Sequence, residues 1–299
     1  MSAPNPEKPA LGAGTALLAY LALLVGQLVV GAGAQQRSIV VGLWVTEAVA
    51  IALPAIIVLR GAGLRFAPYL GLRSARPGQF LVAAIASAAN QPVVSFLTWV
   101  AREILPGSLV ASFDAKQRLL DAIFAVHALP MTITVVIAAP LGEELFFRGF
   151  AFPALQRSMG LAAAVVVSGI LFSVLHLDPV GFIGLMEIGI LLAALRHWTG
   201  SLWPAVLAHA VNNGVAGAAF LLGFEDPDIP PPWWVLALGA ALLVVGLVLL
   251  VRLLRRPSPA PPREEPAREG PRGFRFSRAA GLSLFWLAAV VAGVVLLVR

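Results

Sequence analysis

The sequence of 299 residues contains no cysteine and little charge. The absence of cysteine excludes disulfide bonds, thiolate metal sites and cysteine nucleophiles. Only 12% of the residues are charged, against about 25% in an ordinary soluble domain, and 59% are apolar. Uncharged apolar runs recur along the chain, and several exceed the ~18 residues that indicate a membrane-spanning helix. The composition therefore excludes a water-soluble globule and predicts an all-α polytopic membrane protein.

Nine apolar runs are candidate transmembrane helices: residues 11–34, 39–59, 79–101, 125–155, 161–176, 179–195, 202–223, 233–254 and 279–298. The segment 112–125 mixes charged and apolar residues, which is typical of a helix at the membrane interface. Between residues 255 and 278, six prolines alternate with Arg and Glu, a composition that predicts an extended linker. We therefore expect a transmembrane core at 1–254, a linker at 255–278 and an extra C-terminal helix at 279–299.

Basic residues are distributed unevenly between the predicted loops. The loops after the second, fourth, sixth and eighth runs are rich in arginine, whereas the opposite loops are balanced or acidic. The positive-inside rule then places the amino terminus in the cytoplasm and the carboxyl terminus outside. The net charge of +6 is thus explained by membrane orientation and predicts no nucleic-acid partner. Frequent Arg, Ala, Gly and Pro are typical of a GC-rich bacterial genome, so we expect a bacterial cytoplasmic membrane.

Five charged residues interrupt the predicted spans: Glu47, Glu143, Glu144, Arg148 and Glu187. A charge in the middle of a membrane helix costs about 2.5–3.5 kcal/mol, so such residues usually face the interior, form pairs and mark a functional site. Because a helix turns by about 100° per residue, Arg148 lies on the same face as Glu144 and can neutralise it. Glu143 lies about 140° away from Arg148, which leaves its carboxylate unpaired and suited to be a general base. The alternative is an ion pair that only locks the helices together.

Two further polar pairs have helical spacing inside apolar runs: Phe172 with His176, and His209 with Asn213. Each histidine alone is compatible with a packing role. Together with Glu143, they provide a base, an orienting group and two donors for an oxyanion, which suffices to hydrolyse an amide with activated water. Glu143, His176 and His209 also form a possible zinc ligand set, so a mechanism with zinc stays open beside one without a cofactor.

Three motifs occur in order between residues 130 and 217: Glu143-Glu144-x-x-x-Arg148, Phe172-x-x-x-His176 and His209-x-x-x-Asn213. They resemble the motifs of the CAAX prenyl protease and bacteriocin-processing family of intramembrane endopeptidases, also called the Abi family. The resemblance implies an eight-helix intramembrane fold, to which the ninth run would be an addition.

The family resemblance also implies roles for the motif residues. Glu143 and His176 would activate water, and His209 and Asn213 would stabilise the oxyanion. Glu144 and Arg148 would brace the site. The implied substrate is a membrane-anchored protein or peptide, which is prenylated in eukaryotic members, and zinc would be at most an optional cofactor.

Several residues lie outside this pattern. Glu187 is expected to have a partner on another helix, and Glu47 is expected to be a buried, hydrogen-bonded, neutral carboxyl; neither is expected to take part in cleavage. His127 and His197 occupy predicted interface positions. Two other functions stay open: an inactive family member that serves as an immunity or scaffold protein, and a proton-coupled transporter, which the absence of an internal repeat disfavours.

Overall fold

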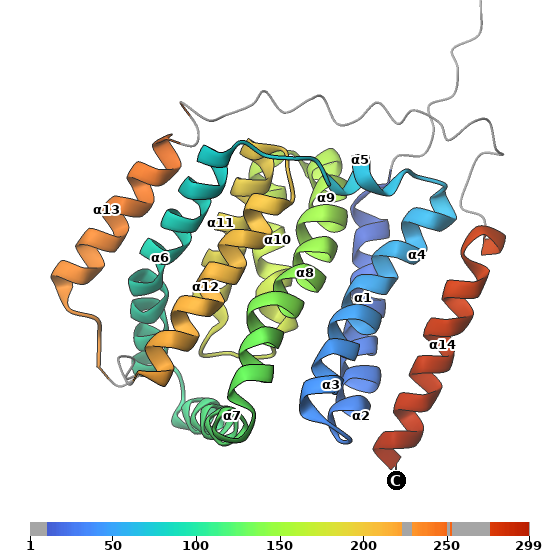
Figure 1. Ribbon diagram of the computed structural model, residues 1–299, viewed down its shortest axis with the longest axis horizontal. Helices are drawn as coiled ribbons and strands as arrows, with labels where there is room; N and C mark the ends of the chain where they lie inside the picture. Colours follow the sequence, from blue (N-terminus) through green and yellow to red (C-terminus); the bar gives the residue numbers. More distant parts are fainter. Residues whose placement is uncertain (1–10, 223–228, 250–251, 253–275, 299) are drawn as a thin grey trace, which may run out of the picture.

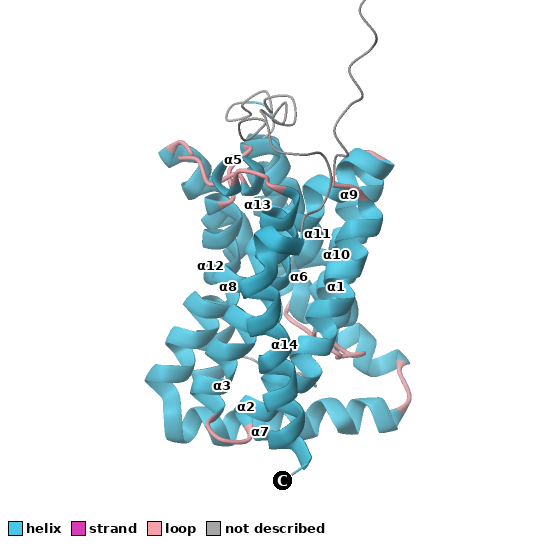
Figure 2. Cartoon of the chain, turned by 90° about the vertical axis from the view of Figure 1, so that its right-hand side faces the viewer, coloured by secondary structure: helices cyan, strands magenta, loops and turns pink. Residues whose placement is uncertain are grey.

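The computed structural model describes residues 11–222, 229–249, 252 and 276–298, and every regular element within them is helical (Figure 2). Nine helical stretches coincide with the nine predicted runs. Six of them are long and apolar enough to cross a membrane, and two shorter ones, Leu161–Leu175 and Trp233–Gly246, are also apolar. The predicted all-α polytopic membrane fold is therefore confirmed.

Several of the nine stretches change between α-helical and wider π-helical turns. The first three are α1 (Ala13–Gly26), η1 (Gln27–Gly31) and α2 (Ala32–Gln35); α3 (Ile39–Val45), η2 (Thr46–Ala52) and α4 (Leu53–Ala62); and, after the short α5 (Phe66–Leu70), α6 (Pro77–Ile104). The fourth comprises α7 (Gly107–Ile133), η3 (Thr134–Ala138), α8 (Ala139–Glu144), η4 (Leu145–Ala151) and α9 (Phe152–Met159). The remaining five are α10 (Leu161–Leu175), α11 (Phe182–Thr199), α12 (Trp203–Leu221), α13 (Trp233–Leu249) and α14 (Phe276–Val298).

Three of the π-helical segments end two residues before a proline. Pro54 follows η2, Pro140 follows η3, and Pro153 follows η4. A proline inside a helix has no N–H to donate, and its ring clashes with the carbonyl four residues earlier. The wider turns accommodate that carbonyl and leave it available to another donor. Two of these segments, η3 and η4, flank α8, which carries Glu143 and Glu144.

The predicted interface segment forms part of α7, which lies across one end of the bundle (Figures 1 and 2). The helical hydrogen bonding continues into the next span, but the backbone kinks at His127, where φ is −126° and ψ is 35°. This kink lies two residues from the predicted boundary at residue 125. The interface helix and the fourth span are therefore one continuous helical stretch with a sharp bend.

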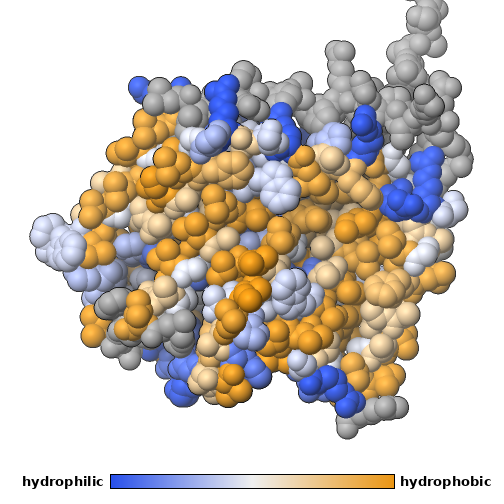
Figure 3. All heavy atoms as spheres, in the orientation of Figure 1, coloured by the Kyte–Doolittle hydropathy of each residue, from blue (hydrophilic) through white to orange (hydrophobic). Residues whose placement is uncertain are grey.

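The surface of the bundle is largely apolar (Figure 3). Leu18 and Leu81, for example, are 69% and 62% exposed, as expected of side chains that face lipid. Inside, Phe146 and Phe147 of η4 pack against Tyr20 of α1, and Phe147 also contacts Phe172 of α10. The Tyr20 hydroxyl donates to the carbonyl of Leu171. This aromatic core fixes η4 against α1 and α10.

The extra C-terminal helix, α14, packs against α2, η1 and α4 at one side of the bundle (Figure 1). Gly293 lies so close to η1 that a Cβ there would meet the Val29 carbonyl oxygen at 2.6 Å. α14 begins at Phe276, three residues before the predicted start. Most of the predicted linker, residues 255–275, lies outside the described part of the chain.

Candidate active site

The predicted pair of Glu144 and Arg148 forms a buried salt bridge. The Arg148 Nη1 donates to Glu144 Oε1 at 2.7 Å, and both side chains are completely buried. The pair forms although Arg148 lies in a π-helical segment, where the assumed 100° per residue does not hold. Glu143 is 6% exposed, and Arg148 makes no ion pair with it within the described residues.

Arg148 also connects η4 to α10 and α11. Its Nη2 donates to the carbonyl oxygen of Gly189 at 3.0 Å, and its guanidinium carbon lies 4.5 Å from the centre of the Phe172 ring. These contacts hold a fully buried cation with a carboxylate, a carbonyl and an aromatic face. The side chain therefore connects η4 with α10 and α11.

His209 of α12 connects the two glutamates. Its Nδ1 lies 3.0 Å from Glu144 Oε1, and its Nε2 lies 3.8 Å from Glu143 Oε2. Because a carboxylate oxygen only accepts, the bond to Glu144 places a proton on Nδ1 and directs Nε2 towards Glu143. The spacing of residues within one helix could not reveal this contact, since it joins α8 to α12.

His176 ends α10 and is only half-buried. Its Nδ1 donates to the Phe172 carbonyl at 2.9 Å, so in the neutral ring Nε2 is an acceptor. The Phe172 ring packs between the two histidines, with its centre 5.0 Å from that of His176 and 5.5 Å from that of His209. Within the described residues, no hydrogen bond or ion pair joins His176 to Glu143.

Asn213 joins α12 to the widened turn before Pro140. Its Nδ2 donates to the carbonyl oxygen of Val135 in η3 at 2.9 Å. In a π-helical turn this carbonyl would pair with the N–H five residues later, which Pro140 lacks, so it is available to the amide, and the bond holds α12 beside α8. One amide N–H of Asn213 is therefore used structurally, while its neighbour His209 faces the glutamates.

The described residues contain no preformed metal site: no group of three or more His, Asp or Glu residues among them is arranged to hold a metal ion. His209 and His176 each direct Nδ1 to an oxygen acceptor, a carboxylate and a backbone carbonyl respectively. Histidines that bind a metal through Nε2 commonly make this kind of contact, so the zinc ligand set stays a prediction. We assign no step of the reaction to zinc.

The two unassigned carboxyls of the sequence have different surroundings. Glu187 accepts a hydrogen bond of 2.6 Å from Asn90 Nδ2 of α6, which confirms the expected partner on another helix. Glu47 is 9% exposed as expected, but its buried Oε2 has no hydrogen-bond partner within the described residues. A protein donor for Glu47 Oε2 is therefore absent among the described residues, and the expected hydrogen bond of this carboxyl stays a prediction. η2 places the side chain against Gly142 of α8.

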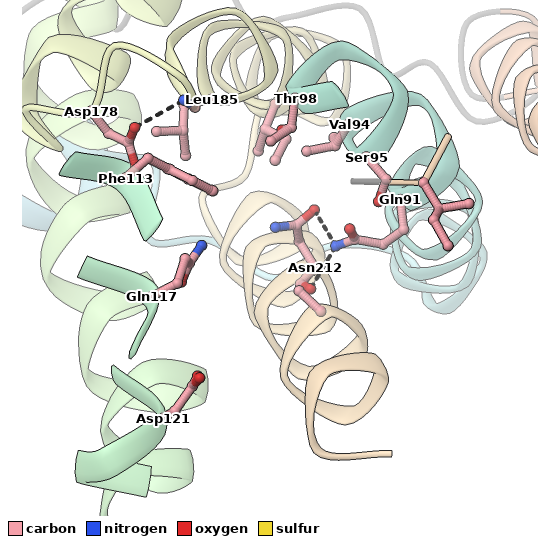
Figure 4. Close-up of a pocket in the computed structure, with 14 residues that line it drawn as sticks. Gln91, Val94, Ser95, Thr98, Phe113, Gln117, Asp121, Asp178, Leu185 and Asn212 are labelled. Atoms are coloured by element: carbon pink, nitrogen blue, oxygen red, sulfur yellow. Dashed lines mark hydrogen bonds between the residues drawn. The ribbon is translucent and has the colours of Figure 1, made fainter. Parts of the chain in front are cut away.

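A cavity of about 500 Å³ opens between α6, α7, α11 and α12 (Figure 4). Its wall includes Gln91, whose Nε2 donates to the carbonyl oxygen and to Oδ1 of Asn212 at 2.8 and 2.9 Å. Asn212 follows His209 by three residues, or about 4.5 Å along the helix axis. Gln91 and Asn90 were not among the predicted site residues, although two adjacent amides within an apolar run are a usable signal. The volume is typical of a ligand pocket.

Residues 125–215 match the family model described as type II CAAX prenyl endopeptidase Rce1-like. The curated protein "Putative membrane peptidase YdiL" of Bacillus subtilis is 30% identical over 100 residues, which are 33% of this chain and 40% of that protein. The matched region thus spans less than half of the relative. No solved structure matches the chain. The resemblance inferred from the three motifs is confirmed, since all three lie within the matched residues.

Proposed function

We propose that this chain, whose residues 125–215 carry the Rce1-like endopeptidase sequence, is an intramembrane endopeptidase of the CAAX type. One observation carries the proposal: Glu143 is buried beside His209, while the neighbouring Glu144 is neutralised by Arg148. This arrangement leaves one carboxylate available for proton transfer and one imidazole oriented towards it. A structural ion pair alone would not require the second glutamate or the histidine.

Glu143 is the general base in this proposal. Its Oε2 has no hydrogen-bond partner within the described residues, so it can accept a proton from water. His176 assists, because its Nδ1–H is held by the Phe172 carbonyl and Nε2 can accept a hydrogen bond. Nδ1–H of His209 is held by Glu144, and as an imidazolium, with a proton on each nitrogen, the ring donates through Nε2 to the oxyanion. The second amide N–H of Asn213 adds a donor on the same helix.

The reaction balances with these groups. Glu143 takes one proton from water, the water oxygen bonds to the scissile carbonyl carbon, and the carbonyl electron pair moves onto oxygen. The carbon–nitrogen bond then breaks, and the leaving nitrogen receives the proton from Glu143. The products are a carboxylic acid and an amine, and the Glu143 carboxylate is restored.

The substrate in this proposal is a membrane-anchored protein or peptide. The cavity beside Asn212 is large enough for part of a polypeptide and is lined by both amide and apolar side chains. Its position one helical turn from His209 allows a bound chain to continue towards Glu143. The substrate reaches the site from within the bilayer, because the helices of the bundle are apolar enough to span the membrane.

The proposal is tested with purified protein in detergent micelles. Two fluorescence-quenched probes are used: a peptide with a farnesylated cysteine four residues from its carboxyl end, and an unprenylated transmembrane peptide. We expect cleavage of at least one probe, and a loss of kcat of about 10²–10⁴-fold in Glu143→Gln. Thermal unfolding of the variant should match that of the wild type. Wild-type kcat in Glu143→Gln, or failure of the wild type to cleave either probe, would overturn the proposed function.

A further inference from the structure

Glu47 is a buried carboxyl that the reaction described above does not use. It lies in η2, is 9% exposed, and its Oε2 is inaccessible and has no hydrogen-bond partner within the described residues. A buried polar atom without a partner is costly and therefore unusual in a stable protein. Glu187, the comparably placed acid of α11, accepts a hydrogen bond from Asn90.

Gly142 brings Glu47 to the site. A Cβ at Gly142 would lie 2.5 Å from Glu47 Oε2 and 3.0 Å from the Glu47 backbone oxygen, so only glycine permits this approach of η2 to α8. Gly142 immediately precedes Glu143 in α8, and both glutamate side chains are buried. Glu47 therefore reaches the catalytic helix from the second span of the protein.

The carboxyls of Glu47 and Glu143 each have one buried oxygen, Oε2, that lacks a hydrogen-bond donor within the described part of the chain. A water molecule has two O–H donors and two lone pairs, and a buried water usually makes two to four hydrogen bonds to groups of this kind. One water between the two carboxyls would give each oxygen a donor and would leave its own lone pairs directed elsewhere.

We propose that Glu47 and Glu143 together hold the attacking water, with Glu143 accepting its proton and Glu47 fixing its orientation. The inference rests on the proposed endopeptidase function and adds a residue outside the three motifs. Glu47 replaces Nε2 of His176 as the acceptor of the second O–H of the water and directs a lone pair towards the scissile carbonyl. The proton balance of the reaction is unchanged, because only Glu143 takes up and returns a proton.

The experiment compares initial rates on the two quenched probes for the wild type, Glu47→Gln and Glu187→Gln. In Glu47→Gln the new amide N–H donates to the Glu143 carboxylate and replaces the water. We expect kcat to fall about 10- to 100-fold while KM changes little, since a misplaced reacting atom costs about this much. Glu187→Gln removes a partly buried span carboxyl that has its own partner, and its kcat should stay within about twofold of the wild type.

Glu47→Asp is the second variant. It keeps the carboxyl but withdraws it by one methylene, and we expect a kcat between those of Glu47→Gln and the wild type. Equal losses in Glu47→Asp and Glu47→Gln would assign the effect to packing against Gly142 and overturn the inference, as would wild-type kcat in Glu47→Gln. If Glu47→Gln does not fold, as judged by thermal unfolding, the partial activity of Glu47→Asp decides the matter: kcat equal to the wild type overturns the inference. An inactive Glu143→Gln beside a fully active Glu47→Gln would leave the proposed function in place.

Discussion

At the scale of single residues, the buried positive charge of Arg148 is balanced by one buried carboxylate, that of Glu144. Both members of the Glu144–Arg148 pair are fully enclosed, whereas in the pair of Lys116 and Asp178 the lysine side chain is 46% exposed. Removing one partner from a buried pair leaves an uncompensated charge, while an exposed pair in water contributes little. The two pairs therefore differ in how strongly they affect folding.

We expect Arg148→Met to lower the free energy of unfolding by about 3–5 kcal/mol, because Glu144 would stay buried without its cation. Lys116→Met is the control, with an expected change of about 0–1 kcal/mol. Both values are measured by titrating the protein in micelles with sodium dodecyl sulfate. Equal changes in the two variants would show that Glu144 finds another partner or a proton.

One contact among the predicted site residues could be predicted from the sequence, but the others could not. Helical spacing predicted that Glu144 pairs with Arg148, and it identified His209 as a candidate. It could not predict that His209 bonds to Glu144, because spacing orders side chains within one helix and not between helices. Glu47 was recognised as unusual, yet its position beside Gly142 depends on how two spans pack.

At the scale of elements, glycines set the distance between α10 and α11. A Cβ at Gly189 would lie 2.7 Å from the Gly169 Cα and 3.4 Å from Arg148 Nη2. Small residues of this kind allow membrane helices to pack closely, since the bilayer supplies no hydrophobic drive for their association. The same contact places the Gly189 carbonyl where it accepts from Arg148.

We expect Gly189→Ala to destabilise the protein by about 1–3 kcal/mol, because α10 and α11 must separate to admit the methyl group. Gly217 of α12 is the matched control: no atom lies within 4 Å of a Cβ there, and alanine should be neutral or slightly stabilising. Thermal unfolding in micelles compares the two variants. A Gly189→Ala protein as stable as Gly217→Ala would contradict the close packing of α10 on α11.

The helical stretches were predictable from apolar runs, but their π-helical turns were not predicted. The estimate of 100° per residue assumes a regular α-helix, and η3 and η4 depart from it on either side of Glu143 and Glu144. A signal was present in the prolines: Pro54, Pro140 and Pro153 each follow such a segment by two residues. Which carbonyl each widened turn frees, such as that of Val135 for Asn213, depends on the neighbouring helix.

At the scale of the whole molecule, charge distinguishes the two ends of the bundle. Arginines gather at the end that carries α5, where α4, α9 and α11 finish and α6 begins (Figure 1). At the opposite end, basic and acidic side chains of α7 and its neighbours pair with each other, as Arg102 does with Asp114 and Lys116 with Asp178. Such asymmetry orients a membrane protein with its basic end in the cytoplasm.

We expect the α5 end to lie in the cytoplasm of a bacterial host and the α7 end to lie outside. The chain has no cysteine, so Ala67→Cys in α5 and Ser108→Cys in α7 each introduce a single thiol at an exposed position. A membrane-impermeant maleimide should label Ser108→Cys in intact cells and Ala67→Cys only after permeabilisation. Labelling of Ala67→Cys in intact cells, and of Ser108→Cys only after permeabilisation, would show the opposite orientation of the same fold. The positive-inside rule would then be overridden in this chain, because the arginine loops would have crossed the membrane despite their charge.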